Sequence, residues 1–157
     1  MARKDAVQVR VVVVKTASAM EDALSIRRTV FIVEQGVTEE EEIDRFDGEP
    51  EKVTDAVHVI AYVDGLPAAT GRLLLNTSPD ESAHIGRVAV LREYRRHGLG
   101  TRVMRALQDE ARRRGYRRAT VAAQVQAMPF YESLGYVVYG DVFLDARIEH
   151  RTMERRL

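Results

Sequence analysis

The stretch REYRRHGLGTRVMRALQDEARRRG, residues 92–115, decides the fold. It places Gly98 and Gly100 at the start of a segment with the apolar spacing of a helix. A helix that only packs would disfavour them, because glycine in a helix costs about 1 kcal/mol relative to alanine. A helix N-terminus offers unpaired N–H groups and a partial positive charge, which together bind anions. The sequence therefore predicts an anion-binding loop that leads into a helix.

The segment after Gly98 is amphipathic. Its apolar residues share one helical face, namely Leu99, Val103, Ala106, Leu107 and Ala111. Gly115 is typical of the position just past a helix C-terminus. The flanking segments AHIGRVAV (83–90) and YRRATVAAQ (116–124) are typical of strands. A strand–helix–strand unit of this length predicts that the two strands pair in parallel.

Further strands and helices are predicted on both sides of this unit. Strands are expected at 7–14, 56–63, 66–76, 136–144 and 146–157, with a hairpin turn at Asp64-Gly65. Helices are expected at 18–36 and 127–136, and Thr38 with Glu41 has the capping-box spacing of a short helix. No linker or internal repeat is visible, so residues 1–157 are expected to form one domain of α/β (α+β) class. Its sheet should be mixed and mostly antiparallel, with about six to seven strands flanked by about four helices.

The composition excludes several classes of protein. The chain has 157 residues, 45% hydrophobic and 31% charged, as is typical of a globular domain. It has no cysteine, which excludes disulfides, thiolate metal sites and a catalytic thiol, and no His, Asp and Glu set has metal-site spacing. No apolar run approaches the roughly 18 residues of a membrane span, and the start MARKDAVQVRVVVVK lacks the core of a secretory signal. We therefore expect a cytoplasmic protein that binds neither a metal nor a membrane.

Charge is balanced over the whole chain but not along it. Lys and Arg number 24, as do Asp and Glu, yet residues 92–118 contain ten arginines and only three acidic residues. Residues 39–51, EEEEIDRFDGEPE, are strongly acidic. These regions indicate either two differently charged ligands or a balanced surface. A nucleic-acid ligand is not expected, because the net charge is zero and glycines interrupt the start of the basic helix.

The glycine loop itself narrows the choice of ligand. It lacks the Gly-Lys-Ser/Thr of the Walker loop and the third glycine of the dinucleotide fingerprint. Arg95-Arg96-His97-Gly98-Leu99-Gly100 closely resembles the coenzyme A (CoA) loop of the GNAT acetyltransferase superfamily, Gln/Arg-x-x-Gly-x-Gly/Ala. PFYESLGY (129–136) resembles the C-terminal motif of that superfamily, and the order of elements matches along nearly the whole chain. RRTVFIVEQGV (27–37) and GDVFLDARIEHRTM (140–153) are similar to the small bacterial group that includes ElaA and YjcF.

The resemblance implies a site for acetyl-CoA. Backbone amides of the loop would hold the pyrophosphate, and the preceding strand would diverge from its neighbour and bond the pantetheine. The residues so implied are Val88, Ala89, Val90, Arg95, Arg96, His97, Gly98, Leu99, Gly100 and Thr101. The arginines could also meet the 3′-phosphate or be solvated helix-face charges, and the alternative for the glycines is a plain turn.

The resemblance also implies catalytic roles. Tyr131 matches the tyrosine that protonates the departing thiolate, and the alternative is an aromatic packing residue. His84 and Glu34 are candidates for the base that deprotonates the amine; an ordered water is the alternative to both, and His84 could be an ordinary strand histidine. Further residues are implied to line the acceptor pocket: Gln35, Arg72, Gln124 and His150. His58 is expected to be structural.

These features predict an acetyl-CoA-dependent N-acetyltransferase that moves the acetyl group directly to a primary amine of a small acceptor. The absence of cysteine excludes an acyl-thiol intermediate. The acidic segment Glu39–Glu42 would favour a cationic acceptor if it borders the pocket, and a capped, solvated helix explains it equally well. A homodimer remains open. The alternative function is a non-catalytic protein of the same fold that binds CoA or acyl-CoA.

Overall fold

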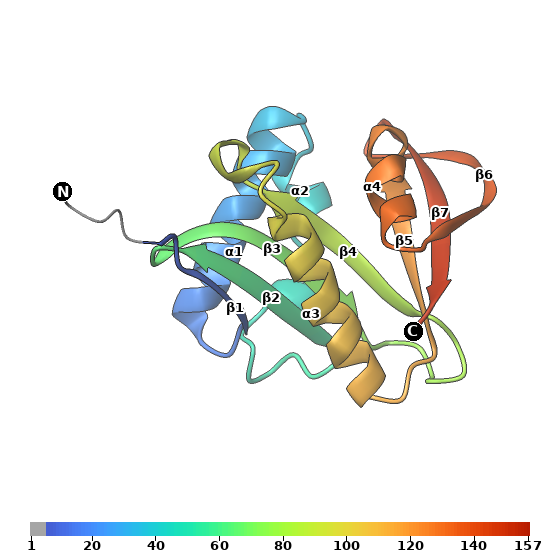
Figure 1. The fold of residues 1–157 in the computed structure, drawn as a ribbon, viewed down its shortest axis with the longest axis horizontal. Coiled ribbons are helices and arrows are strands. Elements are labelled where there is room, and N and C mark those ends of the chain that lie inside the picture. The colour runs from blue at the N-terminus through green and yellow to red at the C-terminus, as the bar shows by residue number, and fades with distance from the viewer. Residues whose placement is uncertain (1–5) are drawn as a thin grey trace.

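The protein is built on one seven-stranded sheet in the order β1-β2-β3-β4-β5-β7-β6 (Figure 1). A computed structural model describes residues 6–157; residues 1–5, which begin the segment expected not to be a secretory signal, lie outside the described residues. The strands are β1 (Val9–Val13), β2 (Ala56–Val63), β3 (Leu66–Leu74), β4 (Ala83–Val90), β5 (Arg118–Gln124), β6 (Val137–Asp145) and β7 (Ile148–Arg156).

The strand pairing is mixed. β4 and β5 are parallel, and the other neighbouring strands are antiparallel. Asp64 and Gly65 both have positive φ, 49° and 81°, as a two-residue hairpin turn between β2 and β3 requires. The predicted mixed, mostly antiparallel sheet and its single parallel crossover are confirmed.

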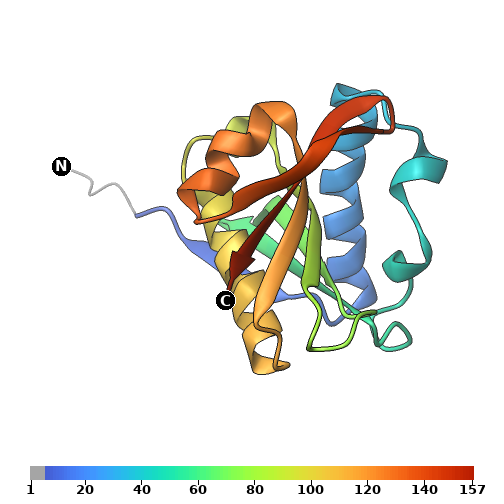
Figure 2. The same ribbon diagram turned by 90° about the vertical axis from the view of Figure 1, so that its right-hand side faces the viewer.

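Helices cover both faces of the sheet (Figure 2). The α-helices are α1 (Ala17–Arg27), α2 (Glu39–Glu42), α3 (Leu99–Arg113) and α4 (Met128–Ser133). Side chains alternate along β2, so Val59 and Ala61 join the core beneath α3 while Ile60 joins the core beneath α1. The predicted apolar face of α3 is confirmed at Leu99, Val103, Leu107 and Ala111, which are all buried, whereas Ala106 is half-buried.

The helix predicted at 18–36 changes its winding. α1 ends at Arg27 and continues as the π-helix η1 (Arg28–Glu34). The run from Thr29 to Val33 is rich in β-branched residues, which crowd the tighter turns of an α-helix. Wider turns re-aim the following side chains, and π-turns are common at functional sites. Val30, Phe31 and Glu34 of this segment line the cleft described below.

Three short 3₁₀ turns link the larger elements: η2 (Arg45–Asp47), η3 (Arg92–Tyr94) and η4 (Val125–Ala127). The capping box predicted for α2 is confirmed, since the Thr38 side chain accepts from the Glu41 N–H at 3.2 Å and the Glu41 carboxylate accepts from the Thr38 N–H at 3.1 Å. In residues 6–157, no helix has both the length and the apolar character needed to cross a membrane.

Candidate active site

A cleft opens where the two parallel strands part. Residues Ala83–Ile85 of β4 pair with Ala119–Val121 of β5. Beyond these paired residues the two strands diverge (Figure 1). The cleft has a volume of about 860 Å³ and is lined by η1, β4, the loop before α3, β5, α4 and the β6–β7 turn. Within the described residues, the β5-facing edge of β4 has no strand partner from Gly86 to Val90. Its peptide groups can therefore bond a ligand.

A bulge in β4 shapes one wall of this cleft. Ala89 lies opposite Thr70 whereas Gly86 lies opposite Arg72, so β4 contains one extra residue. Arg87 sits in the bulge with a φ of 54°, which is uncommon for a residue other than glycine. Bulges re-aim neighbouring residues, and strained backbone is common at binding sites. The three residues after the bulge, 88–90, all line the cleft.

The glycine loop forms the end of the cleft at α3. Gly98 is the N-cap of α3 and has a φ of 78°, which residues with a Cβ rarely adopt. No side chain among the described residues caps this helix, so its first N–H groups remain available to an anion. The residues of the loop that line the cleft are Arg95, Arg96, Gly98, Leu99, Gly100 and Thr101. His97, also predicted to bind CoA, is exposed and does not line it.

Gly100 also makes a close approach that the sequence did not reveal. We predicted that it leaves the backbone bare for an anion. A Cβ built on Gly100 would lie 3.2 Å from Cζ and 3.4 Å from Cε1 of Phe130. The glycine thus also allows α4 to pack against the first turn of α3. This contact links the loop to the helix that carries Tyr131.

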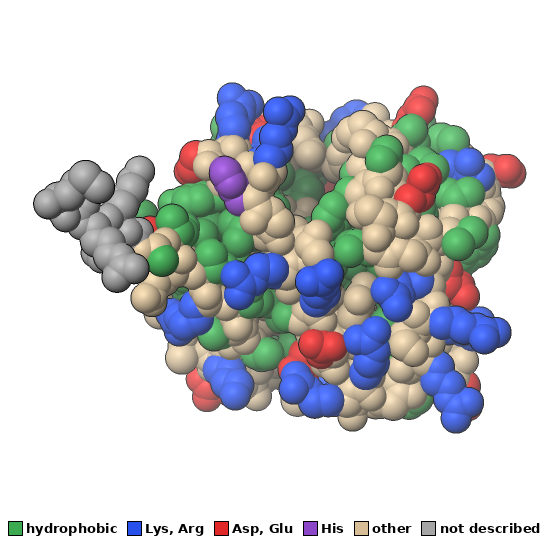
Figure 3. All heavy atoms as spheres, viewed as in Figure 1, with side chains coloured by type: hydrophobic (Ala, Val, Ile, Leu, Met, Phe, Trp, Pro, Cys, Tyr) green, Lys and Arg blue, Asp and Glu red, His purple; other side chains and the backbone are tan. Residues whose placement is uncertain are grey.

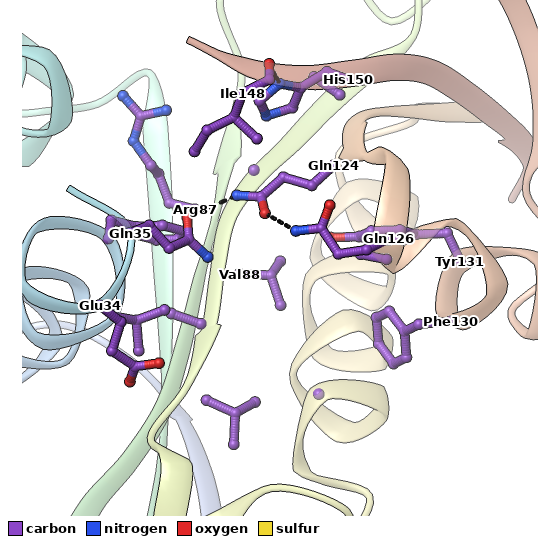
Figure 4. A pocket seen from close by; sticks show the side chains of 18 of the residues that line it. Glu34, Gln35, Arg87, Val88, Gln124, Gln126, Phe130, Tyr131, Ile148 and His150 are labelled. Carbon is purple, nitrogen blue, oxygen red and sulfur yellow. Dashed lines mark hydrogen bonds between the residues drawn. The ribbon is translucent and has the colours of Figure 1, made fainter. Parts of the chain in front are cut away.

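Tyr131 lies on α4 and its side chain reaches the cleft (Figure 4). Its ring packs edge-on against Phe130 and Tyr136, with centroid distances of 5.0 and 5.9 Å. Its hydroxyl has no hydrogen-bond partner among residues 6–157. Burial raises the pKa of Tyr131 to about 12, so the phenol keeps its proton at neutral pH.

The two candidate bases occupy different surroundings. His84 lines the cleft, and its Nδ1 lies 3.3 Å from Thr120 Oγ1. Burial lowers the pKa of His84, and the positive charges of Arg72 and Arg87 lower it further. The ring is therefore neutral at pH 7 and can accept a proton. Glu34 accepts hydrogen bonds from Arg95 Nη2 at 3.0 and 2.8 Å through both carboxylate oxygens. Arg95 thus already occupies both oxygens of Glu34.

The acidic segment is largely neutralised by arginines. Buried Arg27 contacts Glu42 at 2.8 Å and Asp47 at 2.6 Å. Arg72 was expected to line the acceptor pocket, and this was wrong: its side chain is buried against Asp44 and Asp47 at 2.8 and 3.2 Å and does not line the cleft. On β3 it points to the acidic segment, opposite His58 in the strand register. His58 is buried there too, with Nε2 2.8 Å from the Phe46 carbonyl oxygen.

The basic stretch lies mostly outside the cleft. Lys and Arg side chains are spread over the face of the molecule that carries α3 (Figure 3). Of the ten arginines in residues 92–118, only Arg95 and Arg96 line the cleft. Several of the others pair with acidic residues, including Arg112 with Asp109 at 2.9 Å and Arg118 with Glu154 at 3.6 Å.

The end of the cleft away from the glycine loop carries three amide side chains beside the charged Arg87 and Glu41. Gln124 Nε2 donates to Gln35 Oε1 at 2.8 Å, and Gln126 Nε2 donates to Gln124 Oε1 at 2.5 Å (Figure 4). His150 also lines this end, where its Nδ1 donates to the Ile148 carbonyl oxygen at 2.7 Å. Sequence reasoning missed Gln126, because the path of η4 between β5 and α4 has no local signal. Among the described residues, no group of three or more His, Asp and Glu side chains could hold a metal ion.

A family model described as "Acetyltransferase (GNAT) domain" matches residues 34–157. The chain belongs to the GNAT acetyltransferase family. The uncharacterized N-acetyltransferase YjcF of Bacillus subtilis is 35% identical over 145 residues, which cover 92% of this chain and 97% of YjcF. The structure of an acyl-CoA N-acyltransferase from Pseudomonas aeruginosa matches with a TM-score of 0.78 at 30% sequence identity. The match covers 94% of this chain and 99% of the P. aeruginosa chain.

The fold is also that of Escherichia coli ElaA, with a TM-score of 0.79 at 23% identity over 94% of this chain and 99% of ElaA. The resemblance to the GNAT superfamily and to the ElaA and YjcF group, inferred from four short segments, is therefore confirmed. The GNAT fold was predicted correctly as well.

Proposed function

We propose that this GNAT protein is an N-acetyltransferase that uses acetyl-CoA and passes the acetyl group directly to a primary amine. One observation carries the proposal: an uncapped helix start and an unpaired strand edge, Gly86–Val90, border the same cleft. The helix start fits the diphosphate of CoA, and the strand edge fits its amide-bearing pantetheine arm. The acyl-CoA N-acyltransferase from P. aeruginosa and YjcF support this choice of donor and reaction.

The residues of the cleft support a direct transfer. Bound acetyl-CoA supplies a thioester whose carbonyl carbon bonds to the amine nitrogen while the C–S bond breaks. His84, neutral because its pKa is lowered, takes a proton from the amine directly or through water. Tyr131, protonated because its pKa is raised to about 12, gives its proton to the departing sulfur. Glu34 is the weaker candidate for the base, since Arg95 holds both of its oxygens.

The test is an acceptor screen with acetyl-CoA, combined with calorimetry of acetyl-CoA binding. Because the chain has no cysteine, a thiol reagent reports only the CoA that is released. We expect thiol release that depends on the acceptor, and no acetylated enzyme by mass spectrometry when the acceptor is left out. Binding of acetyl-CoA without turnover of any amine would instead support the non-catalytic CoA-binding alternative. Failure to bind acetyl-CoA, CoA or any other acyl-CoA tested would overturn both.

A further inference from the structure

Most of the charge in the cleft is already compensated. Of its four lining carboxylates, three are paired with arginines: Glu34 with Arg95 at 2.8 Å, Glu41 with Arg147 at 3.1 Å, and Glu42 with Arg87 at 3.0 Å and Arg27 at 2.8 Å. The fourth, Asp145, is exposed at the tip of the β6–β7 hairpin. Apart from Asp145, the lining residues therefore offer an incoming amine no free carboxylate.

Three amide side chains occupy the end of the cleft away from the glycine loop. Figure 4 shows them in a row across the cleft, from Gln35 near Arg87 to Gln126 near Tyr131, with Gln124 between them. Val88 and Phe130 lie on one side of the row, and Ile148 and His150 lie on the other. An amide offers both hydrogen-bond donors and acceptors without a charge. The row thus suits a polar, uncharged group rather than an ion.

This lack of free negative charge selects among amines. Only a neutral amine can attack a thioester, and a nearby carboxylate would stabilise the ammonium form instead. An α-amino group titrates near pH 7.7–8.0, so roughly a third of it is neutral at pH 7.5, whereas a lysine amine near 10.4 is only roughly 0.1% neutral. The difference arises because an adjacent electron-withdrawing group lowers the basicity of the amine. A cleft whose one unpaired lining carboxylate among the described residues is the exposed Asp145 gives the more basic amine little compensation.

We propose that the acceptor is a small, weakly basic primary amine with an uncharged amide or hydroxyl group beside the amine-bearing carbon, as in an amino-acid amide or an amino sugar. The inference rests on the acetyltransferase function proposed above and adds the class of acceptor. Gln124 and Gln126 bind the amide or hydroxyl group, and the amine lies on the Tyr131 side of the row. Polyamines and lysine side chains are poor acceptors.

The experiment compares kcat/KM at pH 7.5 for four acceptors: glycinamide, glucosamine, Nα-acetyl-lysinamide and spermidine. We expect glycinamide or glucosamine to exceed the other two by tenfold or more, and the better of the pair distinguishes an amide neighbour from a hydroxyl neighbour. A higher kcat/KM for the lysine derivative or spermidine overturns the inference. So does turnover of none of the four by a protein that binds acetyl-CoA, a result that leaves the donor part of the proposed function standing.

A charge placed in the row gives a second readout. Gln124→Glu adds a carboxylate between Gln35 and Gln126, and should shift the ratio of kcat/KM for spermidine to that for glycinamide by about tenfold toward spermidine. Gln8→Glu adds the same charge at an exposed residue outside the cleft and should leave the ratio unchanged. An unchanged ratio in a folded Gln124→Glu protein with wild-type acetyl-CoA affinity contradicts the role of the row.

Discussion

Arg147 forms a two-point ion pair with Glu41 at the end of the cleft away from the glycine loop, with both N···O distances at 3.1 Å. Arg147 stands at the tip of the β6–β7 hairpin, and Glu41 belongs to α2 on the opposite wall. The tip is a tight turn in which Ala146 and Arg147 have φ values of 48° and 66°. The Arg147 side chain is 65% exposed, and exposed ion pairs hold weakly. The hairpin tip and α2 are therefore joined here by a weak contact.

Arg147→Gln should release the hairpin tip. We expect faster amide hydrogen exchange in residues 143–149 with little change in Tm, because the pair is exposed. In the wild type, 0.5 M salt should have a similar effect, since salt screens exposed charges. Arg156→Gln, at an exposed arginine farther along the same hairpin, is the control. Identical exchange in the Arg147 variant and the wild type would show that the pair does not hold the tip.

The buried and exposed arginines at the end of α1 should differ sharply in their effect on stability. Arg27→Met leaves Glu42 and Asp47 without their buried partner, and breaking a buried pair typically costs about 3–5 kcal/mol. Arg28→Met removes pairs with Glu21 and Glu39 whose arginine is 38% exposed, and should cost at most about 1 kcal/mol. Urea denaturation measures both. Equal losses of unfolding free energy in the two variants would contradict a larger contribution from the buried ion pairs of Arg27.

Stability should fall on acidification because of His58. Burial lowers the pKa of this histidine, and its Nδ1 has no partner among the described residues. As the pH falls through about 6.5, the unfolded chain binds a proton that the folded chain excludes, so the free energy of unfolding decreases. His58→Gln should reduce this dependence below neutral pH, and the part that remains comes from His84, whose pKa burial also lowers. His97→Gln, at an exposed histidine, should leave it unchanged.

Tyr131→Phe should lower kcat with little effect on stability or acetyl-CoA affinity. General acid catalysis contributes about 10²–10⁴-fold, and the lower end is expected because a thiol leaves readily. Since burial raises the pKa of Tyr131 to about 12, its ionisation should produce no alkaline loss of rate below pH 10. Tyr139→Phe makes the same chemical change at an exposed tyrosine of β6 and serves as the control. A wild-type kcat in Tyr131→Phe, with chemistry rate-limiting, would return the residue to a packing role.

Gly100→Val should weaken acetyl-CoA binding by about tenfold or more, because its side chain collides with Phe130 and blocks the helix start. Adding Phe130→Ala separates the two causes. We expect the double variant to regain thermal stability but not affinity. Full recovery of calorimetric affinity would mean that the glycine serves the packing of α4 alone.

The elements were predictable from the sequence because local patterns determine them. Gly98 marks the start of α3 through its own backbone preference, and Asp64-Gly65 marks the hairpin turn in the same way. The ion pairs were not predictable, because Arg27 meets Glu42 and Asp47 only after the segment from η1 to η2 has folded over β2 and β3. Arg72 was misplaced because its direction depends on strand register. The expected roles of Tyr131, His84 and Glu34 remain predictions.

The divergence of β4 from β5 also bears on how such a protein can evolve. A ligand along Gly86–Val90 meets peptide groups, which nearly every residue type supplies alike. An acceptor bound as proposed above meets the side chains of Gln35, Gln124 and Gln126, each of which one substitution can replace. Related proteins can thus keep the same acyl donor, because the main chain binds it, while substitutions of these side chains change the amine that is modified.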